Sequence, residues 1–190
     1  MKEHIVVSIR ITIALLVITC GFYPALVWAV GQVAFSHRAN GSLITRNGRV
    51  AGSELIGQKF TAARYFHSRP SAVDYDATVS GGSNLGPTSK KLADRIAADV
   101  RAVEGGGAGR KTIPADAVTT SGSGLDPHIS PANAMAQAAR VARANGLPLG
   151  RVQAMIRART EDRFLGVFGE PRVNVLLLNL DLIARRNAGA

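Results

Sequence analysis

Residues 11–35 form an uncharged run that contains no Asp, Glu, Lys, Arg or His and consists mainly of Ile, Leu, Val and Ala. At about 1.5 Å of rise per residue, a helix of this length measures about 37 Å, enough to cross a hydrocarbon core of about 30 Å with some tilt. The run therefore predicts one transmembrane helix after a short N-terminal segment, residues 1–10. We expect the protein to act at a membrane.

Two other uses of this apolar run have to be weighed. Lys2 and Arg10 precede it, and Val27-Trp28-Ala29 would be an acceptable signal-peptide cleavage site, which would make the chain a cleaved secreted protein. The run continues beyond that site, which favours an uncleaved anchor. Cys20 is a poor site for a lipid anchor, because Thr19 precedes it and the apolar segment does not end there.

Small residues recur at helical spacing within the predicted span. Gly21, Ala25 and Ala29 are four residues apart, so we expect them to lie on one helix face where another membrane helix can approach closely. Pro24 removes a backbone hydrogen bond from the same turn. Ionisable residues inside a membrane span are the usual mark of an ion path, and the run contains none. Any transported solute must therefore be conducted by other chains.

The remaining residues, 36–190, have the size of one ordinary domain. The net charge of +10 would suit a nucleic-acid partner, but the basic residues are mixed with acids and form no tail. We therefore expect no nucleic acid as a partner. The only cysteine is Cys20, and the four histidines are widely separated, so no disulfide or metal site is predicted.

The pattern of residues 36–190 predicts a mixed α+β domain on a membrane anchor. Asn47-Gly48 is typical of a two-residue hairpin turn, and residues 58–87 are an irregular stretch rich in Gly and Ser. Apolar spacing and capping residues predict helices over 90–104, from a Ser130 cap to 145, and over 149–159. The apolar residues in 173–181 predict a buried strand.

One glycine-rich segment, residues 105–112, superficially has the form of a phosphate-binding loop. Arg110 occupies the position of the second glycine that such a loop requires. The segment also follows a predicted helix, whereas the loop needs a strand before it and a helix after it. We interpret it as a helix stop and linker.

A second polar segment precedes the helix that Ser130 caps. It contains Ser121, Gly122, Ser123, Gly124, Asp126 and His128. Glycines and hydroxyls before a helix N-terminus can receive an anion or another protein's backbone, so these residues are the candidate nucleotide or partner contacts. The alternative is a membrane-tethered extracytoplasmic hydrolase that uses Ser123 and His128, although no Gly-x-Ser-x-Gly motif is present. Asp126 and Ser130 are expected to bond nearby backbone amides.

Taken together, several strings resemble one family, the C chain of the bacterial Kdp-type high-affinity potassium-transporting P-type ATPase. The resemblance covers nearly the whole chain, and the order and spacing of the strings make it specific. The strings are residues 21–24 (GFYP), 39–43 (ANGSL), 52–60 (GSELIGQKF), 65–71 (YFHSRPS), 80–85 (SGGSNL), 123–131 (SGLDPHISP) and 173–180 (VNVLLLNL).

The resemblance implies a non-catalytic accessory subunit of a potassium uptake pump. Its partners would be an A chain that conducts potassium and a B chain that hydrolyses ATP, whose ATP affinity this subunit would raise as a catalytic chaperone. No cofactor is expected on this chain itself. The family's topology places the N-terminus in the cytoplasm, the helix in the inner membrane and residues 36–190 outside.

This topology restricts any effect on ATP. A domain on the outer face cannot contact ATP bound on the inner face, so the effect would have to pass through the transmembrane helices as a coupling between conformational states. Alternatively, the outer domain could cap the potassium entrance on the A chain.

Overall fold

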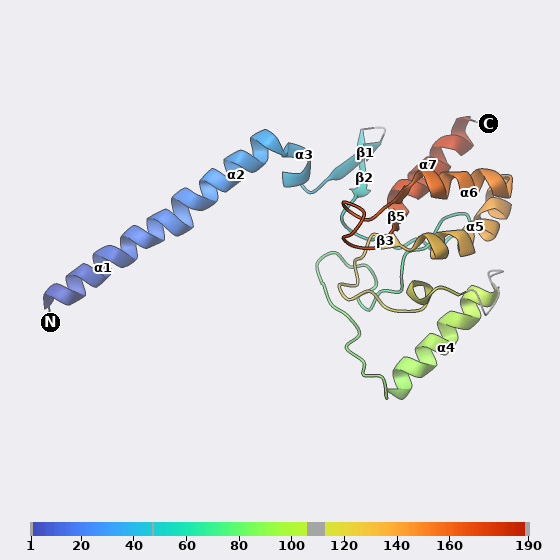
Figure 1. Cartoon of the computed structure of the whole chain (residues 1–190), viewed down its shortest axis with the longest axis horizontal. Coiled ribbons are helices and arrows are strands. Elements are labelled where there is room, and N and C mark those ends of the chain that lie inside the picture. Colours follow the sequence, from blue (N-terminus) through green and yellow to red (C-terminus); the bar gives the residue numbers. More distant parts are fainter. Residues whose placement is uncertain (1, 47, 106–112, 189–190) are drawn as a thin grey trace. The chain divides into compact units, whose positions relative to one another are not determined.

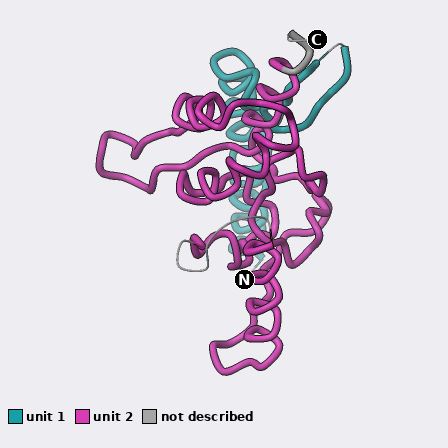
Figure 2. The backbone as a smooth tube through the Cα atoms, turned by 90° about the vertical axis from the view of Figure 1, so that its right-hand side faces the viewer, with its two compact units in different colours: residues 1–53 teal, residues 54–190 magenta. Residues whose placement is uncertain are grey.

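The structure is a computed structural model that describes residues 2–46, 48–105 and 113–188. The chain divides into two compact units, Met1–Ser53 and Glu54–Ala190. Figure 1 shows the order of the elements, and Figure 2 distinguishes the two units by colour. The first unit holds the apolar helix and a hairpin, and the second is a mixed helix and sheet domain, so the predicted α+β class with an N-terminal apolar helix is confirmed.

The apolar helix is longer than the sequence predicts. It runs without a break over Lys2–Ala34, through α1 (Lys2–Leu16), a π-helical segment (Val17–Phe22) and α2 (Tyr23–Ala34). This helix of 33 residues is long and apolar enough to cross a membrane, and none of its most apolar stretch is buried against other parts of the chain. The additional residues at the start, 2–10, mix charged and polar side chains with the apolar Ile5, Val6, Val7 and Ile9 and continue the same helix.

The π-helical segment lies directly before Pro24. The N–H of Tyr23 donates to the carbonyl of Ile18, five residues earlier, and Pro24 has no N–H to continue the α-helical ladder. The disturbance expected at this proline therefore takes the form of one widened turn within a continuous helix. Gly21 lies in the widened segment, while Ala25 and Ala29 lie in α2. Their role as a packing face stays a prediction.

A short helix, α3 (Ser36–Ala39), leads into an antiparallel hairpin of β1 (Leu43–Arg46) and β2 (Arg49–Ser53). Arg46 pairs with Arg49, so two residues make the turn, as predicted. Gly48 has a φ of +73°, which glycine adopts without a steric penalty. Asn47 lies outside the described residues.

The second unit begins with an irregular segment, residues 54–89, in which the structure has no helix or strand. The described residues that follow form four α-helices and a three-stranded antiparallel sheet with the strand order β3-β5-β4. A 3₁₀ turn covers Ala115–Ala117. The helices are α4 (Lys90–Gly105), α5 (Pro131–Asn145), α6 (Leu149–Ala158) and α7 (Val175–Ala188), and the strands are β3 (His128–Ile129), β4 (Thr160–Glu161) and β5 (Arg172–Asn174).

Local signals account for α5. The hydroxyl of Ser130 accepts a hydrogen bond from the N–H of Asn133 at 3.0 Å, Pro131 occupies the first turn, and Gly146 ends the helix with a φ of +64°. The predicted bounds of α5 are confirmed, and those of α4 and α6 are right to within a residue.

The predicted strand over 173–181 is wrong beyond its first two residues. The strand β5 ends at Asn174, and α7 begins at Val175. The Asn174 side chain accepts a hydrogen bond from the N–H of Leu177 at 3.1 Å and so caps the helix. A short apolar run does not by itself distinguish a buried strand from a buried helix, and here packing against α6 selects the helix.

The core of this unit is formed by one face each of α5, α6 and α7 together with β3 and β5. Phe66, from the irregular segment, is fully buried in this core. Asn179 of α7 accepts a hydrogen bond from the N–H of Phe66 at 2.8 Å and donates one to its carbonyl at 3.0 Å. The buried side-chain amide of Asn179 thus satisfies the two backbone groups of Phe66, which in a β-sheet would bond to a neighbouring strand.

We predict that Asn179→Ala destabilises the protein by about 2–4 kcal/mol, because it leaves two buried backbone groups of Phe66 unpaired. Asn145→Ala is the matched control: its side chain also donates to a backbone carbonyl, that of Arg64 at 2.8 Å, but at a partly exposed position where water can replace it. Its expected cost is below about 1 kcal/mol. Thermal unfolding of the full chain in detergent measures both, and equal losses would contradict the role of Asn179.

Candidate functional site

Two irregular segments lie backbone to backbone at the candidate site. The N–H of Gly57 donates to the carbonyl of Leu125 at 2.8 Å, and the N–H of Gly81 donates to the carbonyl of Ser123 at 2.8 Å. A third bond joins the N–H of Ser121 to the carbonyl of Pro70 at 3.0 Å. The polar loop of residues 121–128 is therefore held along its length by residues 57–81.

Glycines permit this close approach. A Cβ atom on Gly57 would lie 2.5 Å from the carbonyl oxygen of Asp126, and one on Gly82 would lie 3.1 Å from that of Gly122. Gly124 has a φ of +72°, and a Cβ there would lie 2.5 Å from a methyl of Val73. The glycine-rich strings are thus explained by contact between two stretches of backbone.

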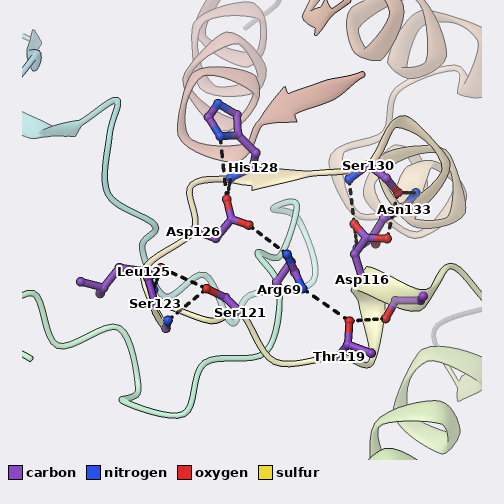
Figure 3. A network of polar contacts seen from close by, with 12 residues as sticks. Arg69, Asp116, Thr119, Ser121, Ser123, Leu125, Asp126, His128, Ser130 and Asn133 are labelled. Carbon is purple, nitrogen blue, oxygen red and sulfur yellow. Dashed lines mark hydrogen bonds and ion pairs between the residues drawn. The ribbon is translucent and has the colours of Figure 1, made fainter. Parts of the chain in front are cut away.

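The serine hydroxyls of the loop bond mainly within the chain (Figure 3). Ser121 is only 2% exposed, and its Oγ accepts from the N–H of Gly124 at 3.0 Å and lies 3.2 Å from the Oγ of Ser123. Ser123 in turn accepts from the N–H of Leu125 at 3.1 Å. Gly124 is buried, whereas Gly122 and Ser123 are exposed at the surface.

Ser123 and His128 do not form the pair that a serine hydrolase needs. In Figure 3 the imidazole of His128 lies beyond the Asp126 carboxylate, on the side away from Ser123. Within the described part of the chain, no hydrogen bond joins the two side chains, and the Ser123 hydroxyl is engaged with Ser121 and Leu125 instead. The geometry therefore gives no support to the hydrolase alternative.

Asp126 is the centre of the charged part of the site. Its carboxylate lies 3.1 Å from the guanidinium of Arg69 and accepts a hydrogen bond from the N–H of His128 at 3.0 Å. Arg69 also reaches the hydroxyl of Thr119 at 3.5 Å. The expected bond from Asp126 to a nearby backbone amide is confirmed.

Asp116 is a second acidic centre, and no motif in the sequence pointed to it. Its carboxylate accepts from the N–H of Ser130 at 2.7 Å, from the Ser130 hydroxyl at 2.9 Å and from the Asn133 amide at 3.1 Å. It thereby joins the 3₁₀ turn to the first turn of α5. Arg69 was also missed, because its partner Asp126 is 57 residues away in the chain.

These side chains line an open groove of about 610 Å³. Of the candidate residues, Asp126 and His128 line it, whereas Ser121, Gly122, Ser123 and Gly124 do not. Its charges are mixed, and no cluster of His, Cys, Asp and Glu that could hold a metal occurs in the described part of the chain. The lining residues are Arg69, Pro114, Ala115, Asp116, Asp126, His128, Ile129, Ser130, Glu170, Pro171 and Arg172.

Both histidines of this unit have a lowered pKa. Burial and then the positive charge of Arg172 lower the pKa of His128, against the opposing effects of Asp126 and Glu161. Burial and then Arg140 lower the pKa of His67, whose ring contacts the carbonyl of Ala62 at 3.2 Å. Each imidazole is therefore neutral at neutral pH, and the groove carries no charge from His128.

A family model described as "K+-transporting ATPase, c chain" matches residues 5–184. The chain belongs to this family. A protein of Gemmatimonas aurantiaca named "Potassium-transporting ATPase KdpC subunit" is 55% identical over 185 residues, which are 96% of this chain and 93% of the relative. Proteins of the same name from Koribacter versatilis and Gloeobacter violaceus are 50% and 52% identical and cover 96% and 95% of this chain and 95% of each relative.

Membership makes this chain an accessory subunit of a potassium-transporting ATPase, and the apolar helix Lys2–Ala34 makes it a membrane protein. Potassium is the ion that such a complex transports. The glycine-rich segment considered as a phosphate loop lies outside the described residues from 106 to 112.

Gly124→Ala tests the close backbone contact. We predict a loss of about 2–4 kcal/mol in the free energy of unfolding, because the new methyl group meets Val73 and the residue must keep a positive φ. Gly122→Ala, two residues away with open space around it, is the control and should stay within about 0.5 kcal/mol of the wild type. Equal thermal stability of the two variants would contradict the packing role of the string.

The two histidines predict a dependence of stability on pH. Their folded pKa values lie below the ordinary 6.5, so unfolding takes up protons below that pH. Their contribution to stability is complete above the unfolded pKa and is lost as the pH falls through the folded values. We expect the thermal midpoint to fall between about pH 7.5 and about pH 5.5, and to fall less in the His67→Gln/His128→Gln variant. An equal fall in both proteins would refute this assignment.

Proposed function

We propose that this chain is the non-catalytic accessory subunit of a high-affinity potassium uptake pump that also contains a potassium-conducting A chain and an ATP-hydrolysing B chain. The observation that carries the proposal is the match of residues 5–184 to the family of the c chain. The absence of charged residues from 11–35 supports it, because a single uncharged helix offers no ion path of its own.

The proposed topology has the N-terminus in the cytoplasm, one helix across the inner membrane, and residues 36–190 as an extracytoplasmic domain. In this arrangement Gly21, Ala25 and Ala29 face a helix of a partner subunit. The groove that Asp126 and His128 line would contact a polar surface of a partner, since its lining combines three acidic residues with two arginines. Gly122 and Ser123 are exposed and available for such a contact.

We further propose that the chain stabilises the pump and raises the ATP affinity of the B chain as a catalytic chaperone. An extracytoplasmic domain cannot touch the nucleotide, so this effect would pass through the membrane helices as a change in the balance of conformational states. The hydroxyls of Ser121 and Ser123 bond within their own loop, which agrees with an indirect route.

The test is affinity capture of the full chain, tagged at its C-terminus, from membranes of potassium-starved cells in mild detergent. We expect mass spectrometry to find a multi-span channel-like chain and a P-type ATPase chain, and the KM for ATP of the captured pump to rise when this chain is removed. Recovery of the tagged chain alone, while the pump is expressed, would overturn the proposal.

One variant tests the packing face in the same experiment. Ala25→Leu should reduce recovery of the partner chains, because the larger side chain keeps the neighbouring helix from approaching. Ala34→Leu is the matched control, since nine residues at about 3.6 per turn place Ala34 on the opposite side of the helix. Loss of partners with the control alone would show that the predicted face is the wrong one.

A further inference from the structure

The first unit is strongly basic. The chain contains no Asp or Glu from residue 4 to residue 53, and the one acid before that stretch is Glu3, at the start of the apolar helix. Three arginines follow the helix, Arg38 in α3 and Arg46 and Arg49 in the hairpin, and we call them the juxtamembrane patch. Arg38 and Arg49 are exposed, and neither forms an ion pair within the described part of the chain.

The patch begins beside the last turn of the apolar helix, because α3 turns back along that helix. The side-chain amide of Asn40 donates to the Oε1 of Gln32 at 3.1 Å. A Cβ atom on Gly31 would lie 3.7 Å from the Cβ of Ala39. Arg38 precedes Ala39 in α3, so its backbone lies beside residues 31–32 and does not extend away from the end of the helix.

The length of the uncharged run places this last turn at the edge of the hydrocarbon core. Gly31 follows Arg10, the charged residue before the run, by about 31 Å of helix at about 1.5 Å per residue. The core is about 30 Å thick, so a span that begins at Arg10 ends at Gly31, and α3 follows in the headgroup layer. Trp28 is 67% exposed one turn before Gln32, and tryptophan is typical of this interface.

The hairpin arginines are tied to α3 and lie opposite each other. The Ser53 hydroxyl donates to the carbonyl of Gly41 at 2.7 Å, which joins the end of β2 to the loop after α3. Arg46 pairs with Arg49 in the hairpin register. Like charges at directly opposite positions destabilise a hairpin, and a nearby anion offsets that repulsion.

An anionic phospholipid surface has the chemistry and the position that this patch requires. Guanidinium groups bind phosphate through paired charge-assisted hydrogen bonds, and basic residues directly after a membrane span are attracted to anionic headgroups. The headgroup layer is also continuous with the lipid around the apolar helix. In the proposed topology the patch is extracytoplasmic, where basic residues are less common than in cytoplasmic loops, so their presence indicates a local use.

We propose that the juxtamembrane patch is a binding site for anionic phospholipid headgroups, in which Arg38 binds the lipid phosphate and the hairpin arginines add to the attraction. The site fixes how deeply the helix lies in the bilayer. The inference rests on the membrane span of the proposed function and on no contact with a pump subunit.

The fluorescence of Trp28, the only tryptophan of the chain, tests the site. The full chain is reconstituted in symmetric phosphatidylcholine vesicles in which a fixed fraction of the lipid is brominated phosphatidylglycerol or, for comparison, brominated phosphatidylcholine. At low ionic strength we expect the quenching to give an affinity about fivefold higher for phosphatidylglycerol, the ratio that corresponds to about 1 kcal/mol for one arginine at the surface. High salt should reduce this preference. Equal quenching by both lipids at low ionic strength would overturn the inference.

Arg38→Gln should abolish the preference of the lipid beside Trp28. Arg10→Gln is the matched control, because it removes the same charge about 27 Å away along the helix and should leave the preference unchanged. An Arg38→Gln variant that retains the wild-type preference would overturn the assignment while the membrane span stands. If neither lipid quenches the wild type, the helix is not in the bilayer, and the span of the proposed function fails together with the site.

Discussion

The contact between the backbones of residues 57–82 and 121–126 is the constraint on which the second unit depends. The irregular segment 54–89 makes no helix or strand of its own, so its backbone groups need partners elsewhere in the chain. Gly57 and Gly81 donate to carbonyls of the polar loop, and Asn179 satisfies Phe66 inside the core. Because the loop leads directly into β3 and α5, the same contact sets the position of Asp126 and His128 in the groove.

Local chemistry made part of this architecture predictable. The cap at Ser130, the glycine at the end of α5 and the apolar spacing of α4 each depend on a few neighbouring residues, and each prediction from them was right. The prediction for residues 173–181 failed because both a strand and a helix can bury a short apolar run. The pairing of Arg69 with Asp126 and the three bonds to Asp116 were beyond sequence reasoning, since tertiary contacts alone bring these residues together.

The candidate loop was found from its composition, but its chemistry is different from what composition indicates. Serines, glycines, an aspartate and a histidine in one short segment resemble the inventory of a hydrolase or a phosphate site. In the fold, Ser121 and Gly124 are buried in contact with another stretch of backbone, and Asp126 is paired with Arg69. Here these polar residues and glycines hold two loops together.

The stability of the second unit depends on buried contacts between segments far apart in the chain. The close backbone contacts at Gly57 and Gly124 and the hydrogen bonds of Asn179 to Phe66 stabilise the unit whether or not a partner is present. The loop of residues 164–168 between β4 and β5 adds little to that stability, because its apolar side chains are exposed and Leu165 has an unfavourable positive φ. Exposing such a surface is unfavourable for an isolated protein in water, and burial against a partner is what would offset that cost.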